Sequence, residues 1–571
     1  MKTIQFKEAN CKNCYKCLRS CPVKAITFKN GQAEIIEEQC MICGRCLTEC
    51  PQNAKVVKND VEKVKKYISK NEKVYVSLAP SFIASFEQDR DWIFAVLKRL
   101  GFTYIEETAV GAALVSKMYE QLLNQKKMKN IITTACPSIN YLIEKYYSEL
   151  IPQMAPVVSP LIAHAKLLRE IYGERIRIVF IGPCISKIEE CQDLRNEGLV
   201  DAVITFEELY DWITMEGIDE NTDLSKELNA MKESIAKIYP MPGGILKTLD
   251  KKSKKNYNCI AIDGVERCME ILDSIKKDKI SNYFIEMNSC NGGCIGGQHM
   301  RQMPGGFLEA RKSILDYTKK GLHESSREIQ KEIRINLHQT FMDRTPKSEI
   351  PSEAIIQGIL NSIGKFSKDD ELNCGACGYA SCIDKAIAVY QEKAQLHMCL
   401  PYMRERAESI SDLILNTTPN AIIAFDGKLR VQEINKTALE MFKLDKKSTE
   451  EMTIWEMLPY EEFHTALKRK ENIYNKKYYY EKYDITVNQS IIFVEKQNIA
   501  ILFIQDISKE EIRRKELLEI RRETVDITQK VIEKQMRVAQ EIASLLGETT
   551  AETKVTLTKL KKTMMSEMSG E

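Results

Sequence analysis

The chain has 571 residues, of which 44% are hydrophobic and 29% are charged, a balance typical of globular proteins and, at this length, of several domains. The formal net charge of +2 gives no electrostatic basis for binding nucleic acid or an anionic membrane. The 19 cysteines, without an apolar N-terminal signal segment or a run of about 18 apolar residues, favour reduced metal-binding thiols in a cytoplasmic protein over disulfides.

Residues 1–58 carry the same cysteine spacing twice. Each copy reads C-x2-C-x2-C-x3-C-P, first at Cys11, Cys14, Cys17 and Cys21 and then at Cys40, Cys43, Cys46 and Cys50. The spacing resembles that of bacterial two-cluster ferredoxins, in which the fourth cysteine of each run serves the other cluster. The resemblance implies one [4Fe-4S] cluster on Cys11, Cys14, Cys17 and Cys50 (the Cys14 set) and a second on Cys40, Cys43, Cys46 and Cys21 (the Cys43 set). A pair of zinc sites is the alternative, although zinc sites prefer paired C-x2-C elements.

Apolar strands alternate with helical stretches over residues 72–344, after a charged stretch at 58–73 that predicts a linker helix. This alternation is typical of a parallel sheet flanked by helices. Four cysteines come directly after three of the strands: Cys136, Cys184, Cys290 and Cys294 (the central set). Open α/β sheets bind ligands where loops leave the carboxyl ends of their strands, so we expect these thiols to share one metal site.

The other cysteines and two nearby histidines show no ligand spacing. We expect Cys191, Cys259 and Cys268 to be core thiols. His164 and His299 are assigned no role.

The segments that hold the central set, IITTACPSI, IVFIGPCISKIEE and NYFIEMNSCNGGCIGG, resemble the three signature motifs of the [FeFe]-hydrogenases. The resemblance implies that the central set holds a [4Fe-4S] cubane and that Cys294 bridges it to a diiron unit with carbonyl, cyanide and dithiolate ligands. It implies that Lys187 donates to a cyanide, and that Ala79, Pro80 and Ser81 line the diiron pocket. The reaction implied is the reversible reduction of protons to hydrogen.

Several positions depart from these motifs. Ala135 replaces a cysteine that passes protons to the diiron unit, and Gly182 and Asn288 replace methionines. Met118 and Tyr119 lie near the place of the acids in the family's proton path. A relay needs titratable groups in hydrogen-bond reach, so we expect slow turnover at a site that still binds hydrogen. The alternative is a cubane-only site, as in the hydrogenase-related iron–sulfur assembly proteins.

Residues 345–404 hold a further cysteine module. Its spacing resembles the single-cubane modules of corrinoid iron–sulfur proteins and implies a fourth [4Fe-4S] cluster on Cys374, Cys377, Cys382 and Cys399 (the Cys377 set). Zinc is again the alternative.

Residues 408–508 resemble a PAS domain, chiefly through LILNTTPNAIIAFDGKLRVQEINKTALEMF. Asp426-Gly427 predicts one hairpin turn, and the KQN segment between two later apolar strands predicts a second. Residues 509–571 repeat apolar side chains every seven residues, which favours a dimerising signalling helix. The alternative is a single helix that packs on its own domain.

The combined fold class is multidomain α/β and α+β: a two-cluster ferredoxin domain, an α/β [FeFe]-hydrogenase domain, a single-cubane module, a PAS domain and a C-terminal helix. The function expected is slow hydrogen oxidation and proton reduction by a hydrogen or redox sensor. The partners expected are hydrogen and protons, a ferredoxin-like carrier, a separate kinase or phosphatase, and a second copy of the chain. A metabolic ferredoxin-linked hydrogenase and a cubane-only redox adaptor are the alternatives.

Overall fold

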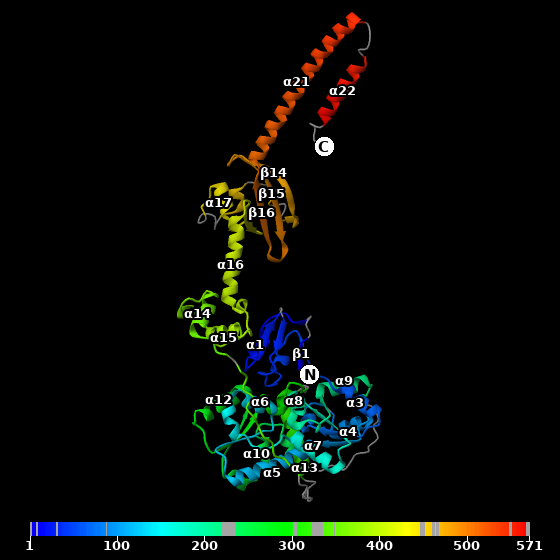
Figure 1. Ribbon diagram of the computed structural model, residues 1–571, viewed down its shortest axis with the longest axis vertical. Helices are drawn as coiled ribbons and strands as arrows, with labels where there is room; N and C mark the ends of the chain where they lie inside the picture. The colour runs from blue at the N-terminus through cyan, green and yellow to red at the C-terminus, as the bar shows by residue number, and fades with distance from the viewer. Residues whose placement is uncertain are drawn as a thin grey trace. The chain divides into compact units, whose positions relative to one another are not determined.

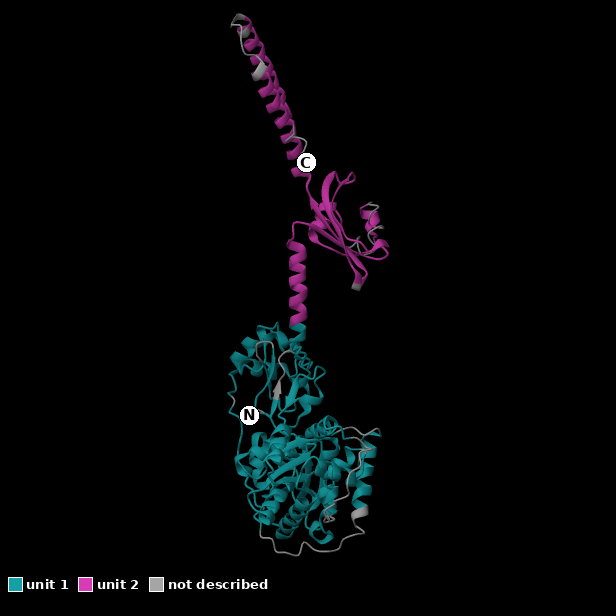
Figure 2. Cartoon of the chain, turned by 90° about the vertical axis from the view of Figure 1, so that its right-hand side faces the viewer, with its two compact units in different colours: residues 1–402 teal, residues 403–571 magenta. Residues whose placement is uncertain are grey.

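The chain divides into two compact units, residues 1–402 and 403–571 (Figure 2). The computed structural model describes residues 3–6, 10–29, 32–86, 88–218, 235–300, 305–322, 335–347, 349–445, 452–458, 463, 468–546 and 551–566. Across the described ranges, no helix combines the length and apolarity that crossing a membrane requires.

The first unit begins with two small antiparallel sheets, β1 (Ile4–Phe6) with β4 (Lys55–Val57) and β2 (Ile26–Lys29) with β3 (Gln32–Ile35). The first three cysteines of each run lie in a loop that leads into a short helix, α1 (Lys16–Ser20) or α2 (Arg45–Thr48). Tyr15 and Gly44 precede these helices in the left-handed region, at φ 57° and 75°. These residues reverse the chain within each loop, as a loop that wraps a compact cluster requires.

The central domain contains two parallel sheets, whereas the sequence predicted one. The four-stranded sheet has the order β6-β5-β8-β9 and the three-stranded sheet the order β10-β11-β7. The strands are β5 (Val74–Leu78), β6 (Tyr104–Glu107), β7 (Ile131–Ile132), β8 (Arg177–Gly182), β9 (Ala202–Thr205), β10 (Asn258–Asp263) and β11 (Tyr283–Asn288). β6 was missed because its sequence, YIEE, carries two acids that the fold buries.

Helices connect and cover these strands. They are α3 (Val61–Ser69), α4 (Arg90–Arg99), α5 (Ala109–Gln125), α6 (Pro137–Tyr146), α7 (Pro160–Tyr172), α8 (Ser186–Gln192), α9 (Phe206–Met215), α10 (Gly244–Thr248), α11 (Lys251–Lys254), α12 (Val265–Lys276) and α13 (Gly306–Leu322). α3 confirms the predicted linker helix. α6 and α8 lie toward β1 and α1 (Figure 1), and hydrogen bonds from Ser138 to Ile42 O and from Thr3 to Glu189 join these regions.

The first unit ends with the Cys377 module, in which α14 (Glu353–Asn361) packs on α15 (Cys382–Tyr390). α16 (Leu400–Thr417) follows and has no buried residue.

The second unit contains an antiparallel sheet of order β13-β12-β16-β15-β14. Its strands are β12 (Ala421–Asp426), β13 (Val431–Ile434), β14 (Ile473–Tyr480), β15 (Ile485–Val494) and β16 (Ile499–Asp506). Both predicted hairpins are confirmed, since β12 pairs with β13 and β15 pairs with β16. α17 (Lys436–Phe442) and α19 (Ile454–Met457) bury Phe442 and Ile454 in the same core as the sheet.

The predicted C-terminal helix is present as α21 (Ser508–Leu546), followed by α22 (Ala551–Ser566). Residues 547–550 and 567–571 of the predicted segment lie outside the described residues. Leu517, Leu518, Val531 and Val538 are between 41% and 53% exposed, so this stripe does not pack on the PAS-like core. Dimerisation through it stays a prediction.

Candidate metal centre

The central set comes together from both parallel sheets. Cys136 caps the N-terminus of α6 shortly after β7, Cys184 follows β8, and Cys290 and Cys294 follow β11. All four line one cavity, and Cys43 of the ferredoxin domain lines it too. The carboxyl ends of two different sheets therefore meet at one group of thiols.

The chemistry of this cavity fits a polynuclear iron cluster. Burial, with a smaller contribution from the neighbouring thiols, raises the pKa of the Cys136 and Cys290 thiols and raises that of Cys294 to about 12. Such thiols ionise readily only against a bound cation. A Cβ on Gly293 would lie 2.6 Å from Pro240 O, so only glycine allows this close approach of the loop.

The four cysteines of the central set are not arranged as the ligands of a single metal ion. Among the described ranges of the chain, no three His, Cys, Asp or Glu side chains group as ligands for one ion. In a cubane each thiolate binds its own iron at a separate corner, so the thiols surround a cavity instead of meeting at a point.

A second cavity shares a wall with the first, because Cys136, Cys184 and Cys294 line both. Although the sulfur of Cys294 is accessible from these cavities, the thiol lies deep in the protein. The remaining lining includes the predicted pocket residues and two of the departures from the motifs: Ala79, Pro80, Ser81 and Lys187, with Ala135 and Asn288. The buried Ser81 Oγ has no hydrogen-bond partner among the described residues, which suits a ligand with acceptor groups.

Lys187 lies at this cavity with its ammonium group already bound. Its Nζ donates to Glu190 Oε2 at 2.8 Å, to Ser159 Oγ at 2.9 Å and to Ala135 O at 3.4 Å. Burial alone would lower the pKa of Lys187, but Glu190 and Cys184 outweigh it and raise the pKa. A donor role toward a cyanide would require one of these three bonds to be exchanged.

The ferredoxin domain brings Cys21 to the second cysteine run. Burial raises the pKa of Cys43 to about 11 and that of Cys40 to about 12, and the nearby Cys21 adds to both shifts. Burial also raises the pKa of Cys17. Lys55 opposes this shift, whereas Cys14 and Cys11 add to it. This proximity is compatible with the assignment of Cys21 to the Cys43 set, while the assignment of Cys50 to the Cys14 set stays a prediction.

The Cys377 set also surrounds one cavity. Cys374, Cys377, Cys382 and Cys399 line it together with the buried Lys385. Gly375 and Gly378 adopt φ values of 69° and 96°, which let the loop curl between the cysteines.

The unassigned cysteines divide by position. Cys191 and Cys268 are buried, as predicted, but the prediction of a core thiol is wrong for Cys259, which is exposed. The reason is that Cys259 lies on β10, an edge strand of the three-stranded sheet.

Sequence reasoning missed Glu286, a fully buried acid on β11. Its carboxylate accepts the N–H groups of Gly243 at 2.9 Å and Leu246 at 3.1 Å, and Asn288 Nδ2 lies 3.4 Å from Oε1. Burial raises the pKa of Glu286 to about 7. An acid inside the otherwise apolar strand YFIEM was the available signal.

His164 is part of a buried polar network that the sequence did not reveal. Its Nδ1 lies 2.8 Å from Ser77 Oγ, and its Nε2 lies 2.9 Å from Glu106 Oε2. Ser77 Oγ in turn contacts Thr108 Oγ1 at 2.8 Å.

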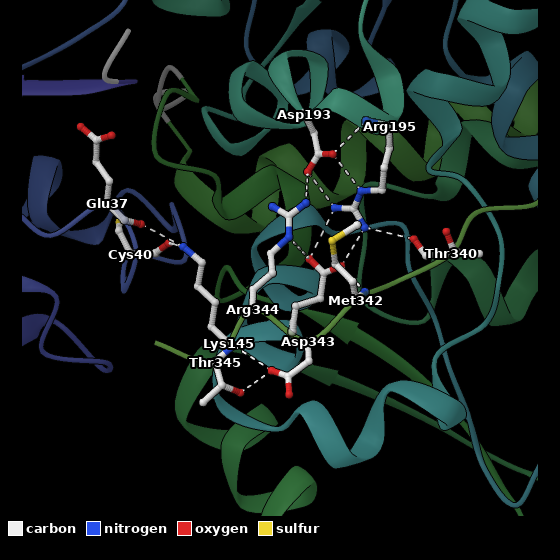
Figure 3. Close-up of polar contacts among 11 residues, drawn as sticks. Glu37, Cys40, Lys145, Asp193, Arg195, Thr340, Met342, Asp343, Arg344 and Thr345 are labelled. Atoms are coloured by element: carbon white, nitrogen blue, oxygen red, sulfur yellow. Dashed lines mark hydrogen bonds and ion pairs between the residues drawn. The ribbon is translucent and has the colours of Figure 1, made fainter. Parts of the chain in front are cut away.

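α6 also connects Cys136 to two other parts of the first unit. Near its C-terminal end, Lys145 points toward the ferredoxin loop and donates to Glu37 O at 2.9 Å and to Cys40 O at 2.7 Å (Figure 3). The adjacent Glu144 is fully buried and accepts from Arg195 at 2.7 Å and from the backbone of Met342 at 3.1 Å. One helix therefore holds a central cysteine, the Cys40 loop and the segment 340–345 that leads to the Cys377 module.

Four family matches cover separate stretches of the chain. Residues 72–298 match the iron-only hydrogenase large subunit, C-terminal domain, and residues 10–54 match a 4Fe-4S dicluster domain. Residues 370–401 match a putative Fe-S cluster family, and residues 409–476 match a PAS domain.

The periplasmic [Fe] hydrogenase large subunit of Nitratidesulfovibrio vulgaris is 29% identical, over 54% of this chain and 88% of that protein. Iron hydrogenase 1 of Clostridium pasteurianum is 24% identical, over 42% of this chain and 52% of that protein. The cytosolic Fe-S cluster assembly factor NAR1 of Vanderwaltozyma polyspora is 29% identical, over 30% of this chain and 34% of that protein.

A solved apo [FeFe]-hydrogenase, a HydA1 variant from Chlamydomonas reinhardtii, matches 51% of this chain and all of its own, with 16% identity and a TM-score of 0.40. The family matches and the hydrogenase relatives agree with the cysteine geometry over residues 72–298. Residues 72–298 are therefore similar to the [FeFe]-hydrogenase large subunit, and the chain also contains regions that match iron–sulfur cluster and PAS domains.

Proposed function

We propose that this protein is a slow, sensory [FeFe]-hydrogenase. The observation that carries the proposal is the pair of adjoining cavities, one surrounded by the whole central set and the other combining Lys187 and Cys294 with Ala135 in place of a proton-passing cysteine. A complete ligand set with a depleted proton path favours binding and slow chemistry over production.

The residues of the chain have distinct proposed roles. The central set holds a cubane, Cys294 bridges it to a diiron unit, and Ala79, Pro80, Ser81 and Lys187 bind that unit. When bound, the diiron unit supplies the redox chemistry of hydrogen. The apolar lining of the second cavity excludes water, and Glu286 holds a proton close to that cavity.

The domains proposed are 1–58, 72–344, 345–404, 408–508 and 509–571, and each family match falls within one of the first four. The chain holds four [4Fe-4S] clusters that carry electrons, and a ferredoxin-like protein in the cytoplasm exchanges electrons with them. The PAS domain and α21 report the redox state to a separate kinase or phosphatase. The exposed apolar stripe of α21 supports a homodimer.

Infrared spectroscopy after anaerobic maturation tests the diiron unit. We expect carbonyl and cyanide bands that change between argon and hydrogen, and about 18 iron atoms per chain, from four cubanes and two further irons. A protein with about 16 irons and no such bands would contradict the enzyme proposal. That result would favour the cubane-only adaptor, for which the similarity to NAR1 over 30% of the chain is the specific observation.

Ala135→Cys is expected to raise hydrogen turnover by about 10²-fold, because a thiol in this lining position restores a proton-passing group. Ala135→Val is the matched control, since valine has a similar size and carries no proton. Turnover in both hydrogen evolution and oxidation, with the infrared bands unchanged, is the measurement. Wild-type turnover already at the level of production enzymes would support the metabolic hydrogenase instead.

A further inference from the structure

The Cys377 module packs directly on the ferredoxin domain. Leu18, Ile26 and Phe28 share one buried hydrophobic cluster with Tyr379 and Met398. Thr27 Oγ1 donates to Glu392 O at 3.2 Å, and Arg19 Nη1 donates to Ala376 O at 3.4 Å. The contact therefore combines a desolvated core with hydrogen bonds to the module's backbone.

The closest approach is at the cysteine loops themselves. Gly378, next to Cys377, has φ +96°, and a Cβ there would lie 3.0 Å from Leu18 Cγ and 3.4 Å from Arg19 N. Lys24 Nζ donates to the carbonyls of Leu18 and Arg19, each at 3.2 Å. Burial lowers the pKa of Lys24, and the thiols of Cys21 and Cys377 both oppose that shift, so one ammonium lies near both sulfurs.

Cys21 belongs to the Cys43 set, which also reaches the central cavity. Cys43 lines that cavity beside the central set. A Cβ on the adjacent Gly44 would lie 2.8 Å from Ile185 Cδ1, and Thr48 donates to Gln298 at 2.9 Å. The Cys43 set therefore meets the central site through Cys43 and the Cys377 set through Cys21.

The Cys14 set lies closer to solvent than the Cys43 set, at least at Cys14. Cys14 is exposed, as are the neighbouring Lys12 and Lys16, although Lys16 pairs with Glu49 at 3.2 Å. An exposed ligand of this set lets an external one-electron carrier approach it.

We propose that the electron path forks at the Cys43 set, which passes electrons directly to the Cys377 set and, separately, to the Cys14 set. The sensor-side cluster is then reduced without passage through the cluster that serves an external carrier. The redox state of the Cys377 set, which precedes the PAS domain in the chain, follows hydrogen even when that carrier is absent.

The electrons balance on this fork. Oxidation of one H2 releases two protons, which go to solvent, and two electrons. Each cubane accepts one electron, from the 2+ to the 1+ state, so one H2 reduces one cubane on each branch. The hydrogen-driven part of this inference rests on the proposed function, whereas the contact between the Cys43 and Cys377 sets does not.

Electron paramagnetic resonance of the full-length holoprotein tests the fork. Cys14→Ala removes a ligand of the Cys14 set and is expected to lower the iron content by about four per chain. After reduction with dithionite, we expect the Cys377-set signal to keep its magnetic coupling to the Cys43 set. Freeze-quench after mixing with hydrogen should show the Cys377 set reduced at a rate within about twofold of wild type.

Thr27→Arg supplies the second test, because Thr27 is buried against Glu392 of the module and lies outside every cysteine loop. We expect this variant to keep its iron but to lose the coupling of the Cys377 set and to reduce that set at least tenfold more slowly. Thr214→Arg is the control, since Thr214 is exposed on α9 of the central domain.

A linear path would give the opposite pattern. Loss of coupling, or tenfold slower reduction of the Cys377 set, in Cys14→Ala with the Cys43 set intact would overturn the fork. Unchanged coupling in Thr27→Arg would also overturn it. If the diiron unit is not inserted, hydrogen reduces none of the clusters. The spectra of the dithionite-reduced protein still show whether the Cys43 and Cys377 sets are magnetically coupled. A failure of the proposed function can therefore be distinguished from a failure of the fork.

Discussion

Glu286→Gln is expected to lower hydrogen turnover by about 10²- to 10⁴-fold, the range for loss of a positioned proton-transfer group. The carboxylate is fully buried, and its pKa of about 7 lets it take and release a proton near neutral pH. Asn288, 3.4 Å from the Glu286 carboxylate, lines both cavities at the central set. Glutamine keeps the size of the side chain, but its amide neither takes up nor releases a proton near neutral pH.

The pH dependence of the hydrogen oxidation rate is a second test of the role of Glu286. Hydrogen oxidation needs the unprotonated acid as proton acceptor, so the wild-type rate should rise as the pH increases through about 7. The Glu286→Gln rate should be low and flat over this range. A wild-type profile without an inflection near 7, or one that the variant keeps, would remove Glu286 from the proton path.

A structural effect of Glu286→Gln must be separated from the chemical one. The amide would face the N–H of Gly243 or Leu246, and an unpaired buried N–H costs about 1–3 kcal/mol. Glu286→Asp is the conservative control, since it keeps a titratable acid and should recover part of the rate. Thermal unfolding and the infrared bands of both variants show whether the site is intact.

Arg195→Leu is expected to destabilise the first unit by about 3 kcal/mol, the low end for breaking a buried ion pair, because Arg344 stays as a partial substitute. Arg195 donates to Asp193 at 2.8 Å and to Glu144 at 2.7 Å, and both carboxylates are at most 4% exposed. Figure 3 shows Arg195, Asp193 and Arg344 pointing toward one another. Removal of the guanidinium leaves two buried acids with one cation.

Scanning calorimetry of the holoprotein measures this effect as a lower unfolding temperature of the first unit. Lys276→Leu is the control within the first unit, because the Lys276–Glu149 pair is solvent-exposed and exposed pairs add little to stability. Equal shifts in the two variants would contradict the assigned role of Arg195.

The sign of the pH effect follows from Asp193. Arg195, together with the backbone and Arg344, overcomes the effect of burial and lowers the pKa of Asp193 from 3.8 to about 2. The stability from this pair is therefore present above about pH 4 and is lost as the pH falls toward 2. The difference in the free energy of unfolding between wild type and Arg195→Leu should be largest above pH 4 and should become smaller below it.

Local spacing predicted the iron–sulfur loops well, because a cubane needs cysteines at short fixed intervals and the chain shows them. The alternation of apolar strands and helices likewise predicted the α/β domain, and Asp426-Gly427 marked a hairpin that β12 and β13 form. Glu286 and Glu106 were beyond this reasoning. An acid inside a strand has a meaning only once the groups packed around it are known.

The sequence by itself determined the candidate metal ligands in each short loop, the order of the iron–sulfur, hydrogenase-like and PAS regions and the helical tail, because these depend on neighbours within a few positions of one another. Only the tertiary structure decided that two separate sheets supply the central set, that Lys187 is already bound to Ser159, and that the Cys377 module packs on the ferredoxin domain. These facts depend on contacts between segments up to several hundred residues apart. Packing and the pairing of buried charges select such contacts, and periodicity along the chain carries no record of them.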